Sequence, residues 1–108
     1  MNTHDELDAR SFAMHRLITQ KIERDPSLMQ IPASNLTRWQ HDVCANSQAY
    51  ISAWQALLSQ GLEASLRVAT EDSEYARAMR QCSPFAGVLT PAERWQFLRD
   101  WKAQHEAR

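Results

Sequence analysis

The segment SPFAGVLTPAERW, from Ser83 to Trp95, constrains the fold more than any other part of the chain. Thr90 can accept a hydrogen bond from a first-turn amide, Pro91 has the φ that suits the first helical position, and Glu93 can reach back to the amide of Thr90. Gly87, just before them, is free to adopt positive φ. The segment therefore predicts the end of one helix, a tight turn and the start of another.

The remaining sequence has helical periodicity and no convincing alternation typical of strands. Pro32 interrupts the second apolar stripe, and we expect two short helices around it, with Ser34 as the cap of the second, in preference to one kinked helix. Apolar spacing, caps and breakers predict this second region over 26–31 and 34–44, and five other helices over 3–24, 46–60, 62–68, 70–82 and 91–106.

These patterns predict an all-α protein with one domain over residues 1–108, a compact array of five or six helices. We expect the first helix, the helix over 46–60 and the last helix to form the core. The chain contains four tryptophans, which indicate either an aromatic core or an aromatic surface for a partner, and the core is the preferred interpretation.

Composition limits the classes of function. A net charge of −1 provides no global basic field, which argues against nucleic acid binding by a lone monomer. Cys44 and Cys82 lack the CxxC spacing of a zinc site and fit a reducing compartment. The acidic amino terminus has no apolar run behind it, and no stretch approaches the ~20 apolar residues of a membrane span. We therefore expect a cytoplasmic protein.

No sequence motif points to catalysis. The chain has no local serine–histidine signature and only two glycines, too few for a phosphate loop, so we expect no catalytic residues, metal or cofactor. Two alternatives stay open. One is a dimeric DNA-binding regulator, and the other is a small helical metal-dependent enzyme that uses a set of acidic and histidine side chains. That set is either Asp5, Glu6 and His15 or Glu71 and Asp72.

The residues with the composition of a protein interface precede and enter the turn. Arg77 and Arg80 lie one helical turn apart, directly before the Ser83-Pro84-Phe85 sequence, and arginine with an aromatic residue is typical of binding hot spots. An alternative is that Glu74 or Glu93 pairs with both guanidinium groups. The expected partner-binding residues are Glu74, Arg77, Arg80, Ser83 and Phe85, with Arg38 and Trp39 as a second patch.

Two stretches, HDELDARSFAMHRLITQKIERDP and EDSEYARAMRQCSPFAGVLTPAERW, resemble a group of small proteobacterial antitoxin-like proteins of similar length. The resemblance covers 5–101, and the second stretch is the more specific. The sequence departs from the group at IPAS around Pro32, where the resembled proteins continue a helix. The matching positions are Asp5, Glu6, Asp8, Arg10, His15, Arg16, Glu71, Asp72, Ser73, Glu74, Arg80, Ser83, Pro84 and Phe85.

The resemblance implies a partner encoded nearby, a toxin of the nucleotidyltransferase-like or PIN-like kind. Together with the absence of catalytic motifs, it leads us to expect a non-enzymatic protein-binding module that binds and neutralises a toxin. A homodimer is left open.

Overall fold

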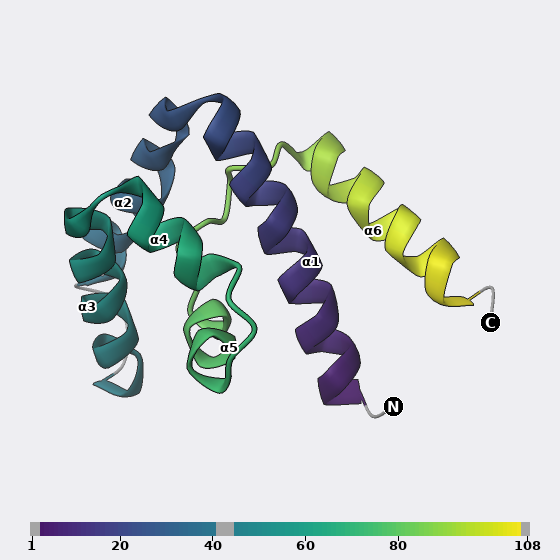
Figure 1. Ribbon diagram of the computed structural model, residues 1–108, viewed down its shortest axis with the longest axis horizontal. Coiled ribbons are helices and arrows are strands. Elements are labelled where there is room, and N and C mark those ends of the chain that lie inside the picture. The colour runs from purple at the N-terminus through teal and green to yellow at the C-terminus, as the bar shows by residue number, and fades with distance from the viewer. Residues whose placement is uncertain (1–2, 41–44, 107–108) are drawn as a thin grey trace.

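Helix α1 (Thr3–Arg24) is the longest element, and most of the other helices pack on one side of it (Figure 1). The computed structural model describes the backbone of residues 3–40 and 45–106 and the side chains of 6–40 and 47–105. All elements in these ranges are helical, which confirms the all-α prediction. They are α1, the 3-10 helix η1 (Pro26–Met29), α2 (Gln30–Trp39), α3 (Ala45–Gln60), α4 (Leu62–Ala69), α5 (Glu74–Gln81) and α6 (Pro91–Glu106).

The region around Pro32 differs from the prediction. Helix α2 begins at Gln30, directly after η1, and it contains Pro32 in its first turn. Amides of the first turn have no partner within a helix, so a proline there removes no hydrogen bond. The predicted break before Ser34 and the cap at that residue are therefore wrong, and the end predicted at residue 44 lies outside the described residues.

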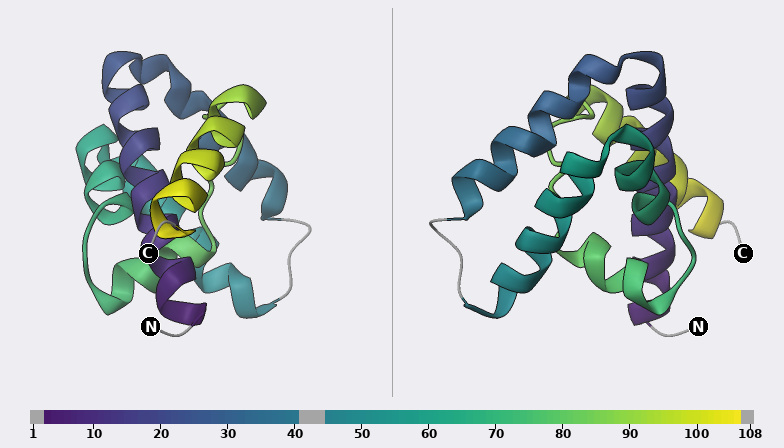
Figure 2. Two further views of the ribbon diagram at one scale, coloured as in Figure 1. Left: turned by 90° about the vertical axis from the view of Figure 1, so that its right-hand side faces the viewer. Right: turned by 60° about the vertical axis from the view of Figure 1, so that its left-hand side comes forward.

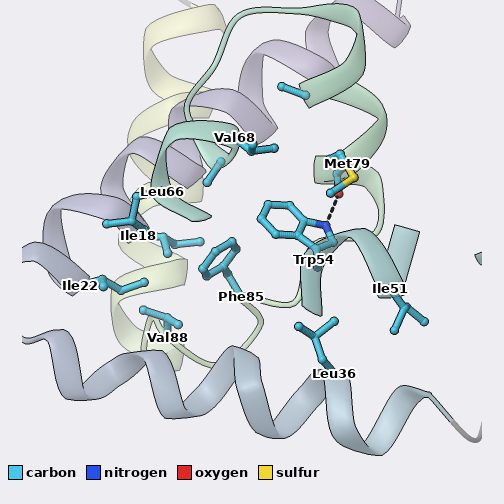
Figure 3. Packing of buried hydrophobic residues seen from close by; sticks show 12 residues of the cluster. Ile18, Ile22, Leu36, Ile51, Trp54, Leu66, Val68, Met79, Phe85 and Val88 are labelled. Carbon is cyan, nitrogen blue, oxygen red and sulfur yellow. Dashed lines mark hydrogen bonds between the residues drawn. The ribbon is translucent and has the colours of Figure 1, made fainter. Parts of the chain in front are cut away.

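Phe85 and Trp54 lie at the centre of the hydrophobic core (Figure 3). Their rings meet edge to face, with centroids 5.4 Å apart and an interplanar angle of 89°. The Trp54 indole N–H donates to the carbonyl of Met79 at 2.9 Å, so its polar group is satisfied although the side chain is fully buried. The buried apolar residues around this pair are Ile18, Ile22, Leu36, Ile51, Leu66, Val68, Ala69, Ala76, Met79 and Val88.

The segment between α5 and α6, residues 83–90, enters this core instead of running over the surface. We call it the SPF turn. It brings Phe85 and Val88 into the space between α1, α2 and α3 (Figures 2 and 3). The Asn35 side chain donates to the carbonyls of Pro84 and Ala86 at 2.8 and 2.9 Å, which satisfies backbone groups that would otherwise be buried without partners. The turn is thus a structural part of the core.

Helix α6 lies outside the core, contrary to the prediction. None of its described side chains, residues 91–105, is buried, and the helix lies on the other side of α1 from α2 to α5 (Figure 1). The predicted core of first, third and last helices is therefore replaced by α1 to α5 and the turn.

We predict that Phe85→Ala lowers the free energy of unfolding by about 3–5 kcal/mol, because it leaves a cavity in a packed core. Denaturant unfolding followed by circular dichroism would measure this. Tyr75→Ala is the matched control, since that aromatic side chain is 56% exposed and its loss should change stability little. A Phe85→Ala variant as stable as this control would contradict the assignment of Phe85 to the core.

Candidate functional site

The structure buries two of the expected contact residues. Phe85 is 1% exposed and Arg80 is 5% exposed, so neither presents a surface to a partner, and that part of the expected patch is wrong. The reason for Arg80 is that its guanidinium group caps α4. It donates to the carbonyls of Glu71, Ala69 and Val68 at 2.8, 3.3 and 3.5 Å. A cation at the carboxyl end of a helix is favoured by unpaired carbonyls and by the helix dipole.

Arg80 also lies over an aromatic ring. Its guanidinium carbon is 4.9 Å from the ring centroid of Phe12 in α1, a cation–π distance. Burial lowers the pKa of Arg80 from its usual value, although an arginine stays charged at neutral pH. This residue therefore links α1, α4 and α5, and its role is structural.

Ser83 joins His15 inside the structure. The Ser83 Oγ atom lies 2.7 Å from His15 Nε2, and His15 Nδ1 lies 2.7 Å from the carbonyl oxygen of Ser11, which fixes Nδ1 as the donor and Nε2 as the acceptor. A serine and a histidine in this order resemble a nucleophile and its base. Here, however, His15 is only 6% exposed and Ser83 Oγ also accepts the amide of Phe85 at 3.3 Å. The hydrogen bond between the two side chains holds the SPF turn against α1.

Two other expected contacts, Glu74 and Arg77, are at the surface. Glu74 and Arg77 are exposed on α5, where Arg77 pairs with Asp72 at 3.3 Å. Neither Arg77 nor Arg80 pairs with Glu74 or Glu93 among the described side chains, so the alternative expected from the sequence is also wrong. Of the expected patch, Glu74 and Arg77 are therefore accessible to a partner, and Arg80 and Phe85 are not.

The second expected patch supports the SPF turn from α2. Arg38 is exposed and donates to Asn35 Oδ1 at 2.7 Å, which orients the amide that holds the turn. Trp39 is half-buried against the core. Both residues have structural contacts, and their predicted contact with a partner is untested.

Several aromatic side chains on α6 are left partly or largely uncovered. Trp95 is 66% exposed, and Phe97, Leu98 and Trp101 are only partly buried. Phe97 and Trp101 stack along the helix at a centroid distance of 6.1 Å. Large exposed aromatic groups that occur together mark an interaction surface more often than a single exposed residue does.

Two open grooves lie on either side of α6. The first, which we call the turn groove, has a volume of about 600 Å³ and lies between α1, the SPF turn and the start of α6; Met14, Ile18, Leu89, Arg94 and Trp95 are among its lining residues. The second, the helix groove, has a volume of about 850 Å³ and lies between α1 and α6. Its apolar lining residues are Ala13, Leu17, Leu28, Leu89, Phe97 and Trp101.

An ion pair anchors α6 at its amino end, between the two grooves. Lys21 Nζ of α1 lies 2.6 Å from Glu93 Oε1 and donates to the carbonyl of Val88 at 2.8 Å. Thr90 and Glu93 form the predicted capping box, with hydrogen bonds of 2.8 and 3.1 Å. The hydrogen bond from Lys21, followed by that from the Thr90 amide, lowers the pKa of Glu93 to about 2, so this anchor stays ionised near neutral pH.

Neither a metal site nor a membrane span is found in the part of the chain that the structure describes. It contains no group of three or more His, Cys, Asp and Glu side chains that could hold a metal ion, and no helix long and apolar enough to cross a bilayer. Comparisons with protein-family models, with curated proteins and with solved structures find no match.

Sequence reasoning missed the role of α6 as an exposed element. The signal was present in Trp95 and Arg94, which are adjacent in the sequence at the start of a helix and combine the residue types enriched in hot spots. The pairing of His15 with Ser83 had no local signal, because 67 residues separate the two in the chain.

We predict that the protein loses stability as the pH falls below about 6.5, the usual pKa of an unfolded histidine. Burial, together with the positive charge of Arg80, lowers the pKa of folded His15. The unfolded chain then binds a proton that the folded chain does not, so this contribution is complete above pH 6.5 and is lost on acidification toward the folded pKa. Urea unfolding at several pH values would test this, with His15→Gln expected to flatten the profile; an equally steep profile in that variant would assign the effect to other groups.

Proposed function

We propose that this chain is a non-enzymatic protein-binding module whose partner binds at the turn groove. The observation that carries the proposal is Trp95, a 66% exposed side chain beside an open groove with apolar lining residues. A tryptophan left uncovered in a protein with its own complete core suits contact with another protein.

The chemistry of the groove supports one kind of partner segment. Met14, Ile18 and Leu89 provide apolar lining for a large side chain. Arg94 lines the same groove, and it forms no ion pair with any acidic side chain that the structure describes. A partner that places an apolar residue in the groove and a carboxylate near Arg94 would satisfy both features.

The resemblance to antitoxin-like proteins supplies the specific form of the proposal. In that form, the partner is a toxin, and binding covers its active site or substrate groove. A rigid domain suits this task because it loses little conformational entropy on binding. The SPF turn is a rigid part of this domain, since Asn35, His15 and Lys21 each form a hydrogen bond to it.

The experiment is co-purification of tagged protein from its native cell at physiological salt, with mass spectrometry of the captured material. We expect one stoichiometric protein, toxic when expressed alone. Trp95→Ala should weaken capture by at least about 30-fold in affinity, the effect of a hot-spot residue, with thermal stability unchanged because the side chain is exposed. Arg94→Glu should act in the same direction.

Tyr75→Ala is the control, because it removes an exposed aromatic group on α5, outside the lining of the turn groove. Capture that Trp95→Ala and Tyr75→Ala leave equally strong would place the contact elsewhere. Recovery of nucleic acid alone would favour the DNA-binding regulator instead.

A further inference from the structure

We infer that the turn groove receives the carboxyl-terminal residue of the partner, an apolar residue whose α-carboxylate pairs with Arg94. This inference rests on the proposed function, and it names the part of the partner that enters the groove. Four properties of the groove carry it: its charge, its apolar lining, its backbone amides and its size.

The groove has a positive charge and no negative one. Among the described residues that line it, Arg94 is the one charged side chain, since the ring of His15 accepts a hydrogen bond at Nε2 and is neutral. Glu93 is not part of the lining and forms its ion pair with Lys21. The Arg94 side chain has no hydrogen bond or ion pair within the described part of the chain. Such a groove is complementary to an anion.

The same lining excludes a ligand with a positive group beside its carboxylate. The ammonium group of a free amino acid would need an acidic partner, and no described lining residue offers one. At the carboxyl end of a peptide, by contrast, the nitrogen of the last residue is an uncharged amide. The lining therefore fits a peptide end better than a free amino acid.

The apolar lining explains why the last residue of this peptide is apolar. Met14, Ile18 and Trp95 line the same groove as Arg94, so the side chain and the carboxylate of the ligand must lie close together. In a carboxyl-terminal residue both groups are attached to one Cα atom. An internal aspartate or glutamate would bring its carboxylate on a second side chain, which has rotamers of its own to immobilise on binding.

Two backbone amides supply further donors for a carboxylate. Ala86 and Gly87 of the SPF turn are exposed and line the groove, and their N–H groups donate to no acceptor that the structure describes. A carboxylate has two oxygens and accepts several hydrogen bonds, so Arg94 alone would leave part of that capacity unused. Capture of a terminal carboxylate by backbone amides is an established mode of peptide recognition.

The size of the groove suits a chain end. Its volume of about 600 Å³ is within the range that holds small ligands. A helix is about 10 Å across, so a 10 Å length of it would occupy about 800 Å³, more than the groove holds. The groove therefore has room for the last few residues of an extended chain.

Peptide titrations of the full chain, followed by ¹H–¹⁵N correlation spectra, test the inference. The probe is N-acetylated Gly-Gly-Leu with a free carboxylate, which should shift the Gly87 amide and the Trp95 indole resonances. The same peptide with a carboxyl-terminal amide should bind about tenfold more weakly, because it lacks the charge that pairs with Arg94. N-acetylated Gly-Gly-Gly should lose a similar factor, because it has no apolar side chain.

Arg94→Gln should weaken binding of the Leu peptide about tenfold and should remove the difference between the free acid and the amide. Arg99→Gln is the matched control. Arg99 is an exposed arginine on the same helix that bonds to Gln96 and lies outside the lining of the turn groove, so its loss should leave binding unchanged.

Several results would overturn the inference. One is an amidated peptide that binds as tightly as the free acid, and another is equal binding by the Arg94→Gln and Arg99→Gln variants. Tighter binding of amidated, N-acetylated Gly-Glu-Leu-Gly would assign the groove to an internal acidic residue, and tighter binding of hexanoate would assign it to a free carboxylic acid. Absence of any shift up to about 10 mM peptide, weaker than the millimolar range, would also contradict it.

Failure of this inference and failure of the proposed function are distinguishable. Once co-purification identifies the partner, deletion of its last three residues should abolish capture. A partner that is released by Trp95→Ala but not by this deletion refutes the inference alone. Peptide binding that depends on Arg94 and on the free carboxylate, with no protein captured from the cell, refutes the proposed function and leaves the carboxylate site in place.

Discussion

The insertion of Phe85 between α1 and the α2–α3 pair determines the rest of the structure. Its ring contacts Trp54 at 5.4 Å and His15 at 6.0 Å, both edge to face, so one side chain from a turn connects the two sides of the core. A turn can be buried in this way only if its backbone groups find partners. Asn35 supplies two donors to its carbonyls, and Ser83 accepts the Phe85 amide. The polar residues around the turn are therefore a condition for burying the apolar one.

The position of α6 is a consequence of this insertion. Phe85 and Val88 belong to the buried core and α6 does not, so the aromatic residues of the last helix stay partly or largely exposed. A chain of 108 residues that contains four tryptophans could have buried all of them. Trp54 is fully buried and Trp95 is largely exposed, so the molecule divides its aromatic residues between the core and a surface helix.

The sequence predicted those features that depend on neighbouring residues. The capping box at Thr90 and Glu93, the bounds of α1 and α6, and the positive φ of Gly87 all follow from local chemistry. The direction of Phe85 does not, because a turn residue can point inward or outward, and only distant groups such as Asn35 decide between them. The burial of Arg80 likewise depends on carbonyls at the end of α4, which no spacing within α5 reveals.

The ion pair and the capping box at the amino end of α6 fix the helix beside the turn groove. The Lys21–Glu93 pair holds the amino end at 2.6 Å, and a Glu93 pKa of about 2 keeps the pair charged at neutral pH. The turn groove lies beside this fixed end, where a preformed surface loses little entropy on binding a partner.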